Sequence, residues 1–228
     1  MRQKLLTHND CYQAGRHIRP AGVMVHSTGA NNPNLSRYVG PNRNNNDWNR
    51  PGVGACVHAF IGLEEDGTVN TVQTLPWDMR GWHAGASANN THISFEICED
   101  GLDDADYFAA VYQEAVELTA YLCELYGLDP LKDGVVICHS EGYRRGIASN
   151  HADVMHWFPK FGKNMDTFRA EVNQKMAEKY EGADWSKEAR DWATSNGIIA
   201  GYGDGEYGWG DPVTREQLAV ILYRLQNK

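Results

Sequence analysis

Two short apolar runs, each followed directly by a histidine, limit most strongly what this chain can fold into. The first run is GVMV at 22–25, before His26, and the second is VVIC at 135–138, before His139. Both runs contain β-branched residues, and the second follows a Lys-Asp-Gly turn, which is typical of the start of a buried strand. Because open α/β sheets bind ligands beyond the carboxyl ends of their strands, we expect both imidazoles at that edge of a sheet.

The segment after His139 supplies further polar side chains, among them His151, Asp153 and His156. One nitrogen or oxygen from this segment, added to His26 and His139, would make a three-ligand zinc site with an open fourth position, as in catalytic zinc sites. The alternative is that these histidines are ordinary hydrogen-bonded residues of the core and its rim. The sequence contains no CxxC pair, which excludes a structural zinc finger.

Length, charge and cysteine usage limit the class of protein. A chain of 228 residues can hold one domain of ordinary size and a small module. The formal net charge of -9 argues against nucleic-acid binding, which needs a basic surface. No run of 18 apolar residues predicts a membrane span. The N-terminal apolar stretch, Leu5-Leu6, is too short for a signal peptide, and five scattered cysteines favour free thiols in a reducing cytoplasm.

Two segments predict further strands. An Asp-Gly turn between two β-rich runs predicts a hairpin over 55–74. The apolar run at 93–98 predicts a buried strand with Glu96 in its middle. A carboxylate is costly there unless it is paired or functional, so Glu96 is either a general base or the partner of a nearby arginine.

Two other segments complete the predicted scaffold. The apolar stripe of 107–125 predicts an amphipathic helix that packs on the sheet and ends at Gly127. The segment 29–54 is rich in Asn, Gly and Pro, which predicts a surface loop. Long loops in compact domains are often functional, so this loop is predicted to form a wall of the site.

Four motifs occur in the order of one enzyme family: His26 after its apolar run, GWHAG at 81–85, ISFEICED at 93–100 and CHSEGY at 138–143. Over about residues 20–175 the chain resembles the type-2 N-acetylmuramoyl-L-alanine amidases, bacterial and phage cell-wall enzymes related in fold to peptidoglycan recognition proteins. The resemblance implies an α/β fold with a central mixed β-sheet flanked by helices. It also implies hydrolysis of the amide between N-acetylmuramic acid and L-alanine in peptidoglycan.

The resemblance implies roles for individual residues. Zn²⁺ would be held by His26, His139 and Asp153. Glu96 would take the proton of the attacking water, and protonated His151 would stabilise the oxyanion. However, Val-Met follows Asp153 where the family has Pro-Gly, and the gap after His139 is longer than usual. A second assignment therefore stays open, with His151 as ligand and Asp153 orienting it.

Candidate substrate contacts come from GWHAG and from the predicted hairpin. Trp82 and His83 lie in GWHAG, and flat aromatic rings suit the apolar faces of sugars. The resemblance implies that His83 lies beside the metal and touches the substrate. His58, in the first strand of the hairpin, is a further candidate for lining the site, with a structural role as the alternative.

The sequence changes character at residue 184. Residues 184–225 contain GIIAGYGDG and VTREQLA, and predict a helix, a Gly-rich loop and a second helix capped near Thr214. This segment resembles an S-layer homology motif, a module that attaches proteins to secondary cell-wall polymers. The resemblance implies wall-binding roles for Trp185, Gly201, Asp204 and Arg215.

These patterns predict a zinc amidase domain at 1–176, a linker at 177–183 and a small helical wall-binding module at 184–228. Peptidoglycan and a secondary cell-wall polymer are the implied partners. Such modules usually act in threes and this chain has one, so a homotrimer formed through this end is one interpretation. A phage or prophage endolysin, made in the cytoplasm without a signal peptide and acting at the bacterial cell wall after release, fits these features. A non-catalytic peptidoglycan-binding protein and a peptidase acting within the stem peptide stay open as alternatives.

Overall fold

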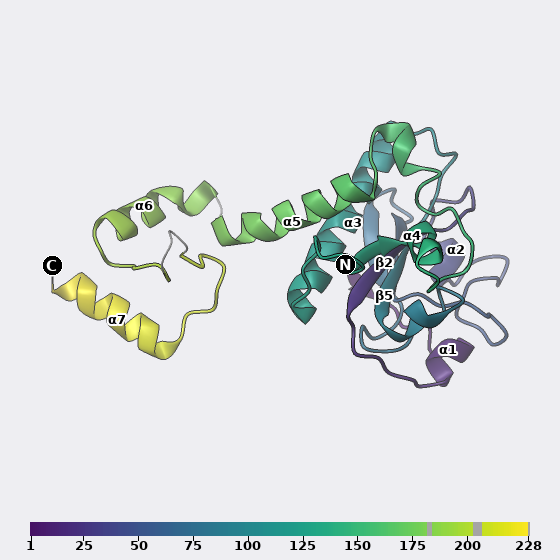
Figure 1. Ribbon diagram of the computed structural model, residues 1–228, viewed down its shortest axis with the longest axis horizontal. Coiled ribbons are helices and arrows are strands. Elements are labelled where there is room, and N and C mark those ends of the chain that lie inside the picture. Colours follow the sequence, from purple (N-terminus) through teal and green to yellow (C-terminus); the bar gives the residue numbers. More distant parts are fainter. Residues whose placement is uncertain (182–183, 203–206, 228) are drawn as a thin grey trace. The chain divides into compact units, whose positions relative to one another are not determined.

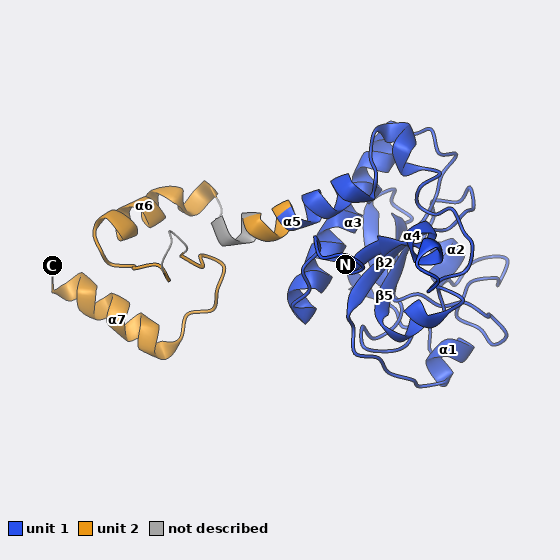
Figure 2. Cartoon of the chain, in the orientation of Figure 1, with its two compact units in different colours: residues 1–173 blue, residues 174–228 orange. Residues whose placement is uncertain are grey.

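The computed structural model describes residues 1–181, 184–202 and 207–227, and the chain divides into two compact units, 1–173 and 174–228 (Figure 2). No helix in these described ranges is both long and apolar enough to span a lipid bilayer. The domain limits predicted at 176 and 184 stay predictions. Residues 182–183 of the predicted linker lie outside the described residues.

A six-stranded mixed β-sheet forms the centre of the first unit (Figure 1). Its strands are β1 (Arg2–Gln3), β2 (Gly22–Ser27), β3 (Ala59–Leu63), β4 (Val69–Gln73), β5 (His92–Ile97) and β6 (Val136–Cys138). The strand order is β1-β4-β3-β5-β2-β6, and only β3 and β4 pair antiparallel. These two strands form the predicted hairpin, whose turn includes Gly67 at φ +83°. The sheet flanked by helices confirms the predicted fold class.

The pairing of β5, β2 and β6 determines where the polar side chains meet. These three strands are parallel neighbours, so their carboxyl ends lie at the same edge of the sheet. His26 is in register with Glu96, and Val25 is in register with Cys138, the residue before His139. The prediction that both histidines lie at the carboxyl ends of strands, at one edge of the sheet, is therefore confirmed, and the two strands are neighbours.

Helices cover the sheet and follow its strands. Those of the first unit are α1 (Asp10–Gln13), α2 (Ser36–Val39), η1 (Ser87–Asn90), α3 (Ala105–Tyr126), α4 (His139–Arg144) and η2 (Phe158–Phe161), and α5 (Met165–Glu181) continues past residue 173. The helix α3 packs on β2, β3 and β4 (Figure 1). Asp104 caps its first turn by accepting from two backbone N–H groups, and Gly127 ends it at φ +62°, in the left-handed conformation that favours glycine. This confirms the helix predicted over 107–125.

The CHSEGY motif fixes the start of α4 directly after β6. The Glu141 carboxylate accepts from the backbone N–H of Cys138 at 3.2 Å and forms an ion pair with Arg169 of α5 at 3.0 Å. Gly142 allows α4 to approach the sheet closely, because a Cβ at this position would lie 2.8 Å from Cε of Met24. These contacts hold the helix that begins with His139.

The segment 29–54 differs from its prediction as a surface loop. It contains α2, and its Leu35, Tyr38 and Val39 are buried in the core, where Tyr38 stacks on Phe60 at 5.0 Å. The prediction was wrong for this part of the segment, because three apolar residues among many Asn and Gly were enough to anchor it in the core.

The second unit contains η3 (Asp184–Ser186), α6 (Lys187–Ser195) and α7 (Arg215–Gln226). Thr214 and Gln217 form a reciprocal capping box at the start of α7. The Arg224 guanidinium donates to the backbone carbonyl of Ile198 and so joins α7 to the chain after α6. The two predicted helices are thus present, and residues 203–206 of the predicted loop lie outside the described residues.

Candidate metal centre

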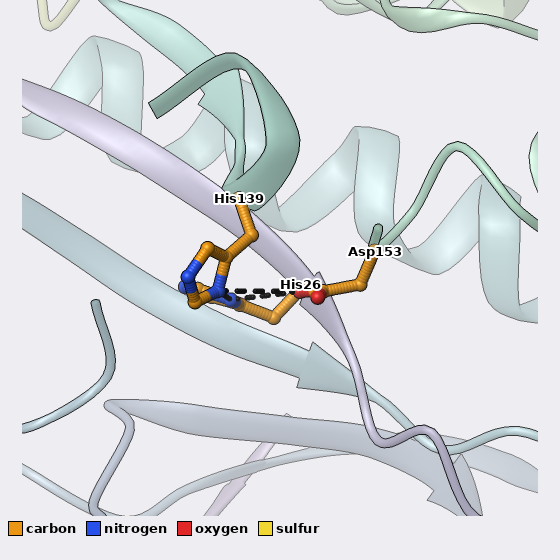
Figure 3. Close-up of side chains that lie close together, drawn as sticks. All are labelled: His26, His139 and Asp153. Carbon is orange, nitrogen blue, oxygen red and sulfur yellow. Dashed lines mark hydrogen bonds and ion pairs between the residues drawn. The ribbon is translucent and has the colours of Figure 1, made fainter. Parts of the chain in front are cut away.

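Three ligand atoms from separate elements meet beyond the strand ends (Figure 3). His26 lies in β2, His139 begins α4, and Asp153 lies in the loop that follows α4. The Nδ1 atom of His26 lies 3.0 Å from Nδ1 of His139 and 3.0 Å from Oδ2 of Asp153, and the latter two atoms are 3.6 Å apart. Two ligands bound to a tetrahedral zinc at about 2.05 Å would be about 3.3 Å apart, so these spacings fit one ion.

Hydrogen bonds on the far side of the His26 ring show that its Nδ1, the nitrogen that faces the cluster, carries no proton. Nε2 of His83 contacts the backbone carbonyl of His92 at 3.3 Å, and a carbonyl only accepts, so this nitrogen carries the proton of His83. Burial lowers the pKa of His83 well below its usual range, so the ring is neutral and its Nδ1 accepts. That Nδ1 lies 3.0 Å from Nε2 of His26, which must therefore donate.

The Nδ1 atoms of His26 and His139 and Oδ2 of Asp153 face one another, and Nδ1 of His139 is bare as well when the proton of this ring lies on Nε2, toward Ser149. Burial lowers the pKa of His139 to about 4, so its imidazole is also neutral at neutral pH, the form that binds metals. In that tautomer two imidazole lone pairs and a carboxylate oxygen converge within 3.6 Å of one another, an arrangement that a cation between them stabilises. The residues of the site therefore fit a divalent metal ion.

Glu96 lies next to this cluster on the neighbouring strand. Its Oε2 atom is buried and has no hydrogen-bond partner among the residues that the structure describes. Burial raises the pKa of Glu96 well above its usual range, and the negative charges of Asp153 and Glu99 raise it further. No ion pair joins Glu96 to an arginine in the part of the chain that the structure describes. The alternative role of Glu96, as the partner of a nearby arginine, is therefore not supported.

An open cavity of about 1280 Å³ contains the cluster and Glu96. The predicted substrate and catalytic residues Trp82, His83 and His151 line it as well. The His151 ring lies 4.5 Å from the His139 ring, but its Nδ1 contacts the Ser149 hydroxyl. Asp153, rather than His151, thus completes the ligand cluster.

The sequence of the first unit matches a known family over most of its length. Residues 16–156, more than half of the chain, match the family described as N-acetylmuramoyl-L-alanine amidase. The chain belongs to this amidase family. A second match, to the S-layer homology domain, covers residues 182–219.

Individual relatives agree with this family. The chain is 26% identical over 181 residues to Protein Ami of Listeria monocytogenes, a match that covers 74% of this chain and 18% of that protein. The chain thus spans less than a fifth of the length of this relative. Its fold is similar to the crystal structure of Staphylococcus aureus hydrolase AmiA in complex with its ligand, with a TM-score of 0.54 and 25% identity over 69% of this chain and 73% of that chain. The structure of PlyL gives a TM-score of 0.51 at 19% identity, over 75% of this chain and 96% of that chain, and shows the fold alone.

His58 of the amidase does not reach the cavity. Its side chain is buried, its Nδ1 accepts from the backbone N–H of Ser94 at 3.0 Å, and its Nε2 donates to the carbonyl of Met79 at 2.7 Å. Burial lowers its pKa to about 4. With both ring nitrogens bonded to the protein, His58 has the structural role that was the alternative to substrate contact.

The structure also brings polar residues of the amidase into the cavity that the sequence did not single out. Ser149 lies between His139 and His151, and Glu99 accepts from Nε2 of His156 at 2.8 Å. Nothing in the local pattern distinguishes Ser149 from other loop serines. Glu99 was part of a motif, but its partner His156 lies 57 residues away, and only the fold joins them.

The residues predicted to bind the wall lie in the second unit of the amidase. Trp185 lies in η3 and is 89% exposed, and Gly201 and Arg215 are exposed as well. Asp204 lies outside the described residues. The described positions are thus accessible from solvent.

Proposed function

We propose that the amidase uses Zn²⁺, held by His26, His139 and Asp153, to hydrolyse the amide between the lactyl group of N-acetylmuramic acid and L-alanine in peptidoglycan. The observation that carries this proposal is the meeting of three acceptor atoms beside the unpartnered Oε2 of Glu96 in an open cavity. The amidase family match, and the likeness to AmiA, support the same chemistry.

The chain's own residues suit each step of such a hydrolysis. Zn²⁺ supplies a Lewis acid that makes water acidic and polarises the amide carbonyl. Glu96, whose Oε2 is unbonded and whose pKa is raised by burial, accepts a proton from the attacking water and passes it to the leaving amine. His151, in its protonated form, stabilises the negative charge that develops on the carbonyl oxygen. Trp82 and His83 form the cavity wall on which the substrate rests.

Two alternatives differ from this proposal in what they require of the site. A non-catalytic peptidoglycan-binding protein needs neither three converging ligands nor a buried, unpaired carboxyl, so both features favour the enzyme. A peptidase that cuts within the stem peptide would use the same catalytic groups, and the products of digestion separate it from an amidase.

Digestion of purified peptidoglycan followed by mass spectrometry tests the proposal. We expect muramic acid residues freed of peptide, and intact stem peptides that begin with L-alanine. A chelator should abolish the reaction, and added Zn²⁺ should restore it. Fragments cut inside the stem peptide would support the peptidase instead, and binding without any product would support the non-catalytic protein.

We propose further that the second unit attaches the amidase to a secondary cell-wall polymer through Trp185, Gly201, Asp204 and Arg215, and that it assembles as a homotrimer. Exposed apolar side chains on α7, Leu218, Leu222 and Leu225, support an assembly of this kind. Sedimentation of the full chain should give a trimer, and a chain ending near 183 should give a monomer. If both chains sedimented as monomers, the homotrimer would be excluded.

The endolysin interpretation, with synthesis in the cytoplasm and action at the wall after release, stays a prediction.

A further inference from the structure

One hydroxyl group lies between a metal-ligand histidine and the proposed catalytic cation. Oγ of Ser149 is 3.1 Å from Nε2 of His139 and 3.1 Å from Nδ1 of His151. His139 presents its other nitrogen, Nδ1, to the cluster with His26 and Asp153. The contact with Ser149 therefore uses the one nitrogen of His139 that is not available to a metal ion.

The surrounding backbone holds this hydroxyl in place. The N–H of Ser149 donates to the carbonyl of Ala84 at 2.8 Å, and the N–H of Ala88 donates to the carbonyl of Ile147 at 3.0 Å. Gly85, at φ +67°, lies beside the serine, and a Cβ at Gly85 would be 3.0 Å from Ser149 Oγ. The last glycine of GWHAG thus leaves space for the Ser149 side chain, and two backbone hydrogen bonds fix its loop.

Counting donors and acceptors gives the direction of these hydrogen bonds. An imidazole that binds a metal ion through Nδ1 carries its proton on Nε2, so His139 donates to Oγ of Ser149. The hydroxyl oxygen has two lone pairs, so it can accept this bond and a second one from the Nδ1–H of His151 in its protonated form. One hydroxyl therefore satisfies both rings, whereas an alanine would keep only the backbone contact of residue 149 with His139.

We propose that Ser149 is a positioning residue that holds His139 in the tautomer with a bare Nδ1 and, through the same hydroxyl, orients the ring of His151. Metal binding and the placement of the proposed oxyanion-stabilising group would then depend on one side chain. The inference rests on the proposed function of this site. His83 has the equivalent place behind the other histidine ligand, because its Nδ1 accepts from Nε2 of His26.

Three full-length variants test the inference: Ser149→Ala, Ser149→Thr, which keeps the hydroxyl, and Asn150→Ala, an exposed neighbour in the same loop. We expect Ser149→Ala to bind Zn²⁺ roughly 10- to 100-fold more weakly in competition with a chelator, the range typical of residues that orient metal ligands. At saturating Zn²⁺ its kcat should fall while KM is unchanged, because His151 is no longer oriented. Ser149→Thr and Asn150→Ala should retain wild-type values.

A measurement on the metal-free protein separates this inference from the proposed function. NMR of ¹⁵N-labelled histidine reports which ring nitrogen carries the proton, and Ser149→Ala should shift His139 away from the form protonated on Nε2. Wild-type tautomer and wild-type Zn²⁺ affinity in Ser149→Ala would overturn the role of Ser149. If the wild type bound no Zn²⁺ and released no product, the proposed function would fail, while the tautomer of His139 would still decide the role of Ser149.

Discussion

Replacing Glu96 with glutamine is expected to lower kcat on purified peptidoglycan by roughly 100- to 10,000-fold, the usual contribution of a general base. The amide has nearly the same shape but does not accept a proton from water. Since Glu96 is not one of the three ligand residues, Zn²⁺ content should remain at the wild-type value. Product release by mass spectrometry and metal content of the purified protein measure the two quantities.

Glu99→Gln is the matched control for this change. Glu99 lies three residues away and lines the same cavity, but its side chain is only 4% exposed and is bonded to His156. We expect this variant to lose stability, because it weakens a partly buried pair, and to retain most of its kcat. Full activity of Glu96→Gln at normal Zn²⁺ content would remove Glu96 from the mechanism.

Glu96→Gln should also change how stability depends on pH in the metal-free protein. Burial holds the pKa of Glu96 above its usual value, so the folded state resists ionisation of this group. The contribution of the neutral Glu96 carboxyl to the free energy of unfolding is fully present below the pKa that this group has in the unfolded chain. It is lost as the pH rises toward the folded-state pKa. Relative to wild type, Glu96→Gln should therefore gain stability as pH rises above about 4.5, the ordinary value for glutamate.

The parts of the fold that the sequence predicted are those set by local patterns. The Asp-Gly turn, the apolar stripe before Gly127 and the two apolar runs before His26 and His139 each act over a few residues, and all four elements are present. The sequence could place the ends of β2 and β6 at the same edge of the sheet because a histidine follows each apolar run. The family resemblance carried by the four motifs then placed Glu96 beside these two histidines.

The features that the sequence missed depend on contacts between distant segments. Leu35 and Tyr38 are buried because they meet Phe60, which no pattern within 29–54 indicates. His58 is directed into the protein by Ser94 and Met79, and these partners are known only once the strands are paired. Side-chain direction at single positions is therefore where the sequence is least informative.

The choice between Asp153 and His151 as third ligand predicts opposite results for two alanine variants. Asp153→Ala removes one of three ligand atoms, so Zn²⁺ affinity should fall by more than the roughly 10- to 100-fold typical of residues that only orient ligands. His151→Ala leaves His26, His139 and Asp153 in place and should retain Zn²⁺. Its kcat should still fall, by roughly 100-fold or more, because the cavity loses a charge-stabilising donor.

Chelator competition and steady-state kinetics on the same preparations distinguish the two assignments. Excess Zn²⁺ should partly restore activity to Asp153→Ala, because the two histidines remain, and should do nothing for His151→Ala, whose metal site is intact. If His151→Ala lost Zn²⁺ and Asp153→Ala kept it, His151 would be the ligand and Asp153 the residue behind it. That exchange would require the His151 ring to leave Ser149, since its Nδ1 now contacts that hydroxyl at 3.1 Å while Oδ2 of Asp153 lies 3.0 Å from His26. The geometry therefore favours Asp153 as ligand and leaves His151 free to meet the substrate.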